Sequence, residues 1–340
     1  MGEPGNIASV PREQPFRCNQ ADARFGKSAA ERKIPAQLRR RGGPRVGPRD
    51  SCHSWAVLNS IDCVVLAVRD LEAAVDSYAR LFGRSPAVRQ PGRDEGLETV
   101  RFPLGNTTLA LSAVIGRGPF ADAISARIDR HGEGILSVLF RTDDADACAL
   151  ELRDRGLEAL APLDREGPEG SIMDRRTVVL PPSATRGTIL AAVEHGDGVE
   201  GPEGLPPGGP DAASTIHGLD HVVVNSPDIE SSRVLYGEGL GLRLALDRSF
   251  EARGLRMLFF RIGGVTVEVV GSLDTIPDGK QPDRFGGLAW KVEDVHAARA
   301  RMTRQGFDVS EQRPGNKAGT CVFSVRSDTC GVPTLIIGPE

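Results

Sequence analysis

Two ionisable side chains lie in strongly apolar surroundings in the C-terminal half of the sequence. Glu268 is the only charged residue in the run Val265–Val270, and His221 directly precedes three consecutive valines. Both runs are typical of buried β-strands. A buried carboxylate is costly unless it is paired, hydrogen-bonded or bound to a metal. We therefore expect His221 to be the partner of Glu268, provided that the two strands turn both side chains to one inner face.

Three interpretations of this pair are compatible with the sequence. His221 and Glu268 could hold a divalent metal with a third ligand, so that a metal-bound oxygen stabilises an enediolate or enolate. They could instead form a metal-free acid/base pair, with Glu268 as the base and His221 tuning it. In the third interpretation they are a hydrogen-bonded remnant that lines a ligand pocket without chemistry. If a metal is bound, zinc, iron, manganese, nickel and cobalt are not distinguished.

Composition restricts the class of protein that must position these residues. The chain has 340 residues, 39% of them hydrophobic, which is enough for two domains with cores. Its net charge of −4, and the lack of an apolar run near the ~20 residues that a membrane span needs, predict a soluble protein with no membrane or nucleic-acid partner. The six cysteines have no C-x-x-C spacing and follow no secretory signal, which favours reduced thiols and a cytoplasmic location.

Two segments have the composition of linkers or tails. Residues 1–56 contain eleven Lys or Arg, five Asp or Glu and no apolar periodicity, which predicts a disordered basic leader. Ten of the fifteen residues in Gly196–Pro210 are Gly or Pro, which predicts a linker over 196–214. The expected domains are therefore 57–195 and 215–340.

The two expected domains repeat each other. A shift of 158 residues places Asp70–Glu72 on Asp228–Glu230, and a shift of 150 residues places Gly156–Glu158 on Gly306–Asp308. Each domain also contains a weaker half-repeat in which one strand, one helix and several strands follow in order. In the first domain the predicted segments are strand 63–68, helix 70–82, strands 97–103 and 107–112, then strand 135–141, helix 144–155 and strands 177–180 and 188–193. In the second domain the units begin at 221–225 and 288–292.

This fourfold βαβββ pattern, with Asp-Leu-Glu-x5-Tyr and a glycine that closes the helix, resembles the vicinal oxygen chelate superfamily. That superfamily includes glyoxalase I, methylmalonyl-CoA epimerase, extradiol and 4-hydroxyphenylpyruvate dioxygenases, and bleomycin-resistance proteins. The resemblance implies an α+β fold in which four βαβββ modules form two glyoxalase-like open barrels. It also implies that the site lies inside a barrel.

The superfamily places its metal ligands on the first and last strand of each module. The resemblance carries these places onto Cys63, Ser137, His221 and Gly287 in the first strands, and onto Ala110, Ala191, Glu268 and Leu335 in the last strands. Only His221 and Glu268 are usual ligands for such a metal, whereas zinc and iron sites generally use about three protein ligands. The missing ligands at Gly287 and Leu335 disfavour extradiol-type oxygen chemistry. The N-terminal domain retains no metal-ligand set, so we expect the C-terminal domain to hold the site.

The expected function is that of a glyoxalase-like enzyme of lyase or isomerase type acting on a small carbonyl or hydroxy compound. The alternative is a metal-free small-molecule binding or drug-sequestering protein of the bleomycin-resistance type. The expected partner is a small molecule, and the expected oligomeric state is a monomer or homodimer. The other histidines, His131 and His195 among them, are interpreted as solvated.

Overall fold

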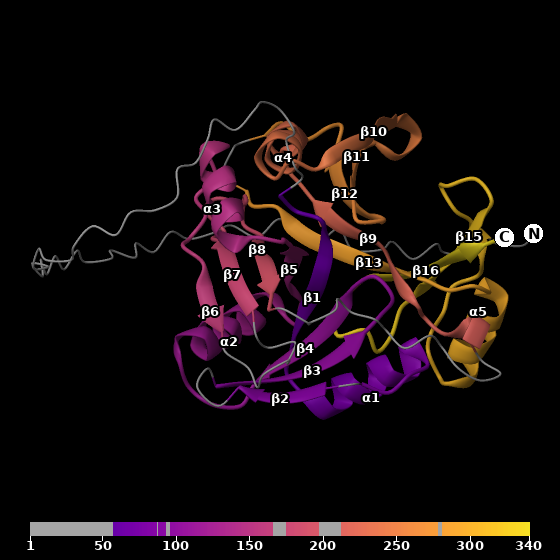
Figure 1. Ribbon diagram of the computed structural model, residues 1–340. Coiled ribbons are helices and arrows are strands. Elements are labelled where there is room, and N and C mark those ends of the chain that lie inside the picture. The colour runs from indigo at the N-terminus through magenta and orange to yellow at the C-terminus, as the bar shows by residue number, and fades with distance from the viewer. Residues whose placement is uncertain (1–56, 87, 93–95, 166–174, 197–211, 278–280) are drawn as a thin grey trace, which may run out of the picture. The chain divides into compact units, whose positions relative to one another are not determined.

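The computed structural model describes residues 57–86, 88–92, 96–165, 175–196, 212–277 and 281–340 (Figure 1). The predicted leader, 1–56, lies outside the described residues. So does most of the predicted linker, although its last residues form a 3₁₀ turn at Ala212–Ser214. Among the helices of the described residues, none is long and apolar enough to cross a membrane.

Residues of the N-terminal half form one eight-stranded sheet, drawn in indigo to pink in Figure 1. Its strand order is β2-β3-β4-β1-β5-β8-β7-β6, and β1 pairs parallel with β4 and antiparallel with β5. The strands are β1 (Ser60–Val68), β2 (Val88–Gly92), β3 (Leu97–Pro103), β4 (Thr108–Val114), β5 (Gly134–Arg141), β6 (Leu163–Arg165), β7 (Arg175–Leu180) and β8 (Ile189–His195). The helices are α1 (Leu71–Phe82), α2 (Pro119–His131) and α3 (Ala145–Asp154).

The C-terminal half repeats this arrangement in a second eight-stranded sheet, with the order β10-β11-β12-β9-β13-β16-β15-β14. Its strands are β9 (Gly218–Asn225), β10 (Arg243–Phe250), β11 (Leu255–Ile262), β12 (Val265–Ser272), β13 (Arg284–Lys291), β14 (Arg313–Pro314), β15 (Thr320–Val325) and β16 (Thr334–Pro339). The helices are α4 (Ile229–Val234), which continues as a π-helical turn at Leu235–Gly239, and α5 (Val295–Arg304). The four βαβββ modules expected from the repeats are thereby confirmed.

The same type of residue caps the start of the helix in every module. An aspartate precedes each helix, and its side chain accepts a hydrogen bond from the backbone N–H three residues further on, which satisfies a donor that the helix leaves open. The four N···O distances lie close together, at 3.0, 2.8, 3.1 and 2.9 Å for Asp70, Asp144, Asp228 and Asp294. The helices predicted from the repeat therefore begin at equivalent capping residues.

Helix α2 was not predicted. It lies between the first two modules, and its apolar residues Ile124 and Ile128 pack against Ala67 of β1 and, less tightly, against Leu97 and Val114. The short or outer strands β2, β6, β10 and β14 were also missed. An outer strand has a neighbour on one side only, so its sequence carries a weaker apolar signal; in β10 every residue but the last is exposed.

One apolar core contains side chains from both sheets. The rings of Phe82, at the end of α1, and Trp290, in β13, meet edge to face with centroids 5.0 Å apart. Tyr78 in α1 donates a hydrogen bond of 3.1 Å to the carbonyl of Thr329. Both tyrosines of the repeat, Tyr78 and Tyr236, are fully buried.

A buried arginine ties three chain segments together. Arg301 in α5 is 5% exposed, and its guanidinium donates to the carbonyls of Arg80 and Leu81 at the end of α1 at 2.5 and 2.8 Å. It also donates to the carbonyl of Ser214 at 3.1 Å. Because these carbonyls belong to a helix end and a turn, the arginine supplies hydrogen bonds that the local backbone does not make.

We expect Arg301→Met to lower the free energy of unfolding by roughly 2–4 kcal/mol, because it removes a charged donor and leaves buried carbonyls without it. Urea unfolding followed by circular dichroism measures the change. The matched control is Arg304→Met, which replaces an exposed arginine of the same helix and should change stability by less than about 0.5 kcal/mol. Equal losses in the two variants would contradict a role for the buried guanidinium.

Candidate functional site

The pairing of β9 with β12 places the two predicted site residues on one face of the second sheet. The strands run parallel, with His221 beside Thr266 and Val223 beside Glu268. Side chains alternate along a strand, so His221 and Val223 share a face, and Thr266 and Glu268 share the corresponding one. The alternate residues of these strands, Val222 and Val267 among them, lie in the apolar core.

His221 and Glu268 lie within ion-pair distance, as the sequence predicted. The Nδ1 atom of His221 is 3.6 Å from Oε1 of Glu268. The same Nδ1 lies 3.0 Å from Oδ2 of Asp220, a residue that sequence reasoning missed. The side chains of His221, Glu268 and Asp220 are only 11%, 15% and 23% exposed. The site is therefore an imidazole between two largely buried carboxyl groups.

The surroundings shift the pKa values of the two carboxyl groups in opposite directions. Burial raises the pKa of Glu268, the charge of His221 lowers it less, and the charge of Asp220 adds to the rise. Burial also acts to raise the pKa of Asp220, but its hydrogen bond with His221 and the charges of His221, Lys291 and Lys317 outweigh it, so this pKa falls below its usual value. Carboxyl groups separated in this way suit proton transfer, because one stays ionised while the other exchanges a proton.

These residues border a pocket of about 510 Å³. Six of its other side chains are apolar, namely Leu246, Phe250, Phe259, Val322, Leu335 and Ile337. Five are cationic, namely Arg248, Arg253, Arg261, Arg313 and Lys317. In the part of the chain that the structure describes, no carboxylate forms an ion pair with any of these five. The pocket therefore combines apolar walls with an excess of positive charge, which suits a small organic anion.

One signal in the sequence could have led to part of this environment. The shift of 158 residues that aligns the domains also places Asp62 on Asp220, so an aspartate recurs at the start of both first strands. Arg248 and Arg253 both lie over the ring of Phe250, at 4.8 and 5.7 Å from its centroid. No local pattern marks Arg313 or Lys317, which reach the pocket only through the fold.

The remaining metal-ligand places of the C-terminal half hold no donor. Leu335 lines the pocket with an apolar side chain, and Gly287 has no side chain. A Cβ atom at Gly287 would lie 2.5 Å from the carbonyl oxygen of Pro333, so a histidine would not fit there without a backbone shift. No group of three or more His, Cys, Asp or Glu among the described residues could hold a metal ion. The residues present therefore do not fit a superfamily-type metal centre.

The corresponding face of the first sheet is filled. Cys63, Ala110 and Ala191, at three of its four ligand places, pack with Leu139 and Val193 in an apolar cluster. Burial raises the pKa of Cys63 to about 11, so this thiol is protonated at neutral pH.

Asp62, the counterpart of Asp220, contacts a histidine that the sequence analysis had interpreted as solvated. Its Oδ1 lies 2.7 Å from Nε2 of His195, with the side chains 7% and 9% exposed. That interpretation of His195 was wrong because the residue ends β8 inside the sheet, and not in a loop. His131, at the end of α2, is exposed as expected.

The fold and the pocket define a class of protein built from paired βαβββ modules around small-molecule sites. Comparison with family models agrees with this class. The model of the Glyoxalase-like domain matches residues 61–238, just over half of the chain, and that of the Glyoxalase/Bleomycin resistance protein/Dioxygenase superfamily matches residues 220–323. The chain belongs to the glyoxalase-like family, and it is a two-domain member of the vicinal oxygen chelate superfamily. A search of curated proteins found no match.

Solved structures share the fold at low sequence identity. A mutant of 4-hydroxymandelate synthase from Streptomyces coelicolor superposes with a TM-score of 0.65 at 18% identity, over 83% of this chain and 93% of that chain. A xylose isomerase-like TIM barrel/4-hydroxyphenylpyruvate dioxygenase fusion protein gives a TM-score of 0.56 at 13% identity, over 84% of this chain and 50% of that chain. Methylmalonyl-CoA epimerase from Mycobacterium tuberculosis gives 0.37 at 22% identity, over 43% and 93% of the two chains. The first two likenesses show the two-domain architecture.

The raised pKa of Glu268 makes a prediction for stability. Below about pH 4 the carboxyl binds its proton in both the folded and the unfolded chain. As the pH rises, the unfolded chain ionises first, so the wild type loses stability until the folded-state pKa is passed. Glu268→Gln removes this loss. We expect the variant to gain stability relative to the wild type between pH 4 and pH 7.

Urea midpoints at the two pH values measure this gain. The control is Glu238→Gln, which removes an exposed carboxyl of the π-helical turn. If the urea midpoints of Glu268→Gln and the wild type differ by the same amount at both pH values, burial does not shift the pKa of this carboxyl.

Proposed function

We propose that this protein is an isomerase or lyase that moves a proton at a carbon next to the carbonyl or hydroxyl group of a small organic anion. The observation that carries the proposal is the largely buried Glu268 carboxyl in contact with His221, at the wall of a pocket with five cationic side chains that form no ion pair within the described residues. Burial shifts the pKa of Glu268 upward, toward neutral pH. A group that both accepts and returns a proton works best when its pKa lies near the working pH.

Each group has one role in the proposed reaction. The cationic side chains bind the negative group of the substrate, and the apolar residues exclude water. Glu268 accepts the proton from carbon, and the electron pair of the broken C–H bond moves toward the neighbouring carbonyl. His221 supplies a hydrogen bond or a proton to the oxygen on which negative charge develops. Asp220 keeps the imidazole oriented through its 3.0 Å contact. Return of the proton completes an isomerisation, and loss of a leaving group completes an elimination.

This proposal takes no step through a metal, because the donor set described above does not fit one. Elemental analysis of the purified full chain tests that choice. One equivalent of zinc, iron, manganese, nickel or cobalt, lost in both His221→Ala and Glu268→Ala, would replace the acid/base scheme with a reduced metal site.

A second candidate function is favoured by the six apolar side chains of the same pocket. They would suit a protein that binds or sequesters a small molecule without transforming it. The two functions differ in what happens to a bound ligand, so a single ligand panel separates them.

The first test is proton exchange at carbon. The full chain is incubated in D₂O with a panel of small 2-oxo and 2-hydroxy carboxylates, and NMR follows deuterium incorporation next to the carbonyl. For an accepted substrate, Glu268→Gln should lower the exchange rate by about 10²- to 10⁴-fold, because it removes the proton acceptor. The control Glu238→Gln should match the wild type. Binding without exchange in the wild type would support the sequestering function instead.

The second test concerns the negative group of the substrate. Arg248→Gln removes one charged donor of the pocket and should raise KM by about tenfold with a smaller change in kcat. Steady-state kinetics on the substrate found by exchange measure both constants. An uncharged analogue, such as the methyl ester, should bind the wild type and the variant equally. An unchanged KM for the anion would rule out this arginine as part of the anion site.

A further inference from the structure

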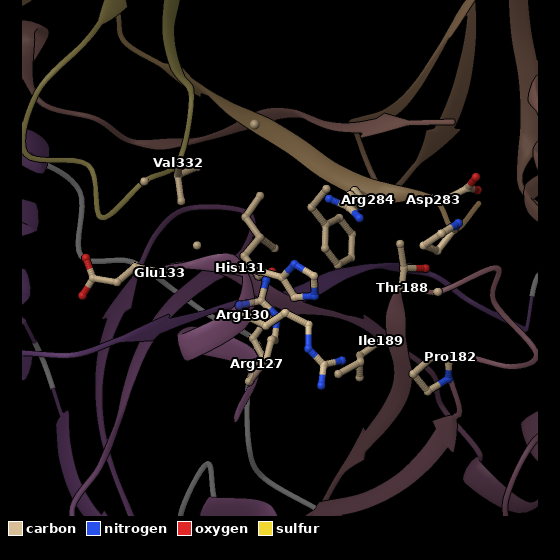
Figure 2. Close-up of a pocket in the computed structure, with 18 of the residues that line it drawn as sticks. Arg127, Arg130, His131, Glu133, Pro182, Thr188, Ile189, Asp283, Arg284 and Val332 are labelled. Atoms are coloured by element: carbon tan, nitrogen blue, oxygen red, sulfur yellow. The ribbon is translucent and has the colours of Figure 1, made fainter. Parts of the chain in front are cut away.

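A second large cleft is distinct from the His221–Glu268 pocket, and a further pocket, lined by His221 and Leu335 on one side and by Gly287 and residues 331–333 on the other, lies between them. The second cleft has a volume of about 730 Å³ and shares no lining residue with the His221–Glu268 pocket. Helix α2 and the start of β5 border one side, residues of the 182–189 segment close one end, and the start of β13 with residues 331–333 borders the other side (Figure 2). The cleft exists because α2 is present, and α2 has no counterpart between the third and fourth modules in the residues that the structure describes.

Cationic side chains meet across this cleft. Arg127, Arg130 and His131 come from the last turns of α2, and Arg284 comes from the start of β13 on the other side (Figure 2). None of the three arginines forms an ion pair with a carboxylate within the described ranges. Partial loss of solvent contact lowers the pKa of His131, and the charges of Arg284, Arg127 and Arg130 lower it further.

One guanidinium is only half satisfied. Nη2 of Arg127 donates a 2.7 Å hydrogen bond to the carbonyl of Ile135. Its Nη1 is buried and has no hydrogen-bond partner among the described residues. A buried charged donor without an acceptor is costly, so a ligand oxygen at this point would be stabilising.

The two acidic residues of the cleft compensate little of this charge. Oε1 of Glu133 accepts a 2.6 Å hydrogen bond from the backbone N–H of Arg69. Asp283 is 1% exposed and contacts Ser232 at 2.6 Å and Arg186 at 3.3 Å. Burial raises the pKa of Asp283 above its usual value, although Ser232 and Arg186 act against the rise. Both carboxyl groups are thus engaged within the protein rather than with the arginines of the cleft.

We propose that this cleft binds a small molecule that carries a compact, multiply charged oxyanion. Arg127, Arg130 and Arg284 hold the oxyanion, because guanidinium groups bind phosphate and carboxylate oxygens through paired N–H donors. The apolar residues Ile189, Phe285 and Val332 also line the cleft and contact the rest of the molecule. A phosphate ester and a polycarboxylate both have this chemistry. The site does not depend on the reaction proposed for Glu268.

Inorganic phosphate and citrate are the probes, titrated separately into the full chain by calorimetry at low salt. The test variant is Arg130→Gln/Arg284→Gln, which changes two exposed residues and should leave the fold intact. The matched control is Arg248→Gln/Arg313→Gln, which removes the same charge from the other pocket. We expect the test variant to weaken binding at the cleft at least tenfold, and the control to leave it unchanged. The tighter probe shows whether the natural ligand is a phosphate ester or a polycarboxylate.

The imidazole of His131 reports where the anion binds. Its NMR signal, assigned through His131→Gln, should shift on addition of the tighter probe in the wild type and in the control, but not in the test variant. The proposal is wrong if the His131 signal does not move at saturating probe. It is also wrong if the two double variants lose affinity equally, which would indicate net charge alone, or if only the control variant loses affinity.

Discussion

The site depends on one constraint, the parallel pairing of the first and last strands within each module. This pairing sets Val223 beside Glu268 and His221 beside Thr266. A shift of one residue would turn Glu268 into the apolar core and Val267 into the pocket. The valines on the opposite face of the same strands hold the register, because their burial would be lost on any such shift. The contact between imidazole and carboxylate is thus maintained by apolar packing on the other side of the sheet.

The parallel pairing of first and last strands brings together apolar residues in the N-terminal half and polar residues in the C-terminal half. In the first sheet β1 pairs with β4 in the equivalent way, but the residues it brings together are Cys63, Ala110 and their apolar neighbours. The aspartate that both halves share then takes a different partner. Asp62 is buried against His195, whereas Asp220 contacts His221 at the edge of a pocket. This face of the first sheet is packed with apolar side chains, and the corresponding face of the second carries a polar centre at the wall of a pocket.

Helix α2 contributes to both outcomes. Its apolar residues Ile124 and Ile128 cover part of the first sheet, and its last turns present arginines to the cleft beside β13. An element without a counterpart in the repeat therefore adds packing on one face and positive charge on the other. The two pockets have in common an excess of cationic side chains over a few buried acids. We therefore propose small organic anions as ligands for both.

Predictions from the sequence succeeded where the signal was local and repeated. The shifts of 158 and 150 residues and the recurring order of strand, helix and strands gave the module plan, and the apolar surroundings of Glu268 and His221 indicated that they are partners. Helix α2 was not predicted because it occurs once, and the outer strands were not predicted because half of their surface faces solvent. Asp220 was overlooked although Asp62 is its counterpart in the first domain. Its side chain contacts the adjacent His221 at a point where the register of β9 against β13 shifts, and the sequence does not show this irregularity.

The sequence by itself determined the module count, the helix of each module and the inner strands, because periodicity acts between residues a few positions apart; it did not reveal α2 or the outer strands. Only the tertiary structure decided that Arg313 and Lys317 reach the pocket of Glu268, that Gly287 has no space for a ligand side chain, and that α2 meets β13 around a second cleft. These features join residues far apart in the chain, and no local pattern encodes such distances.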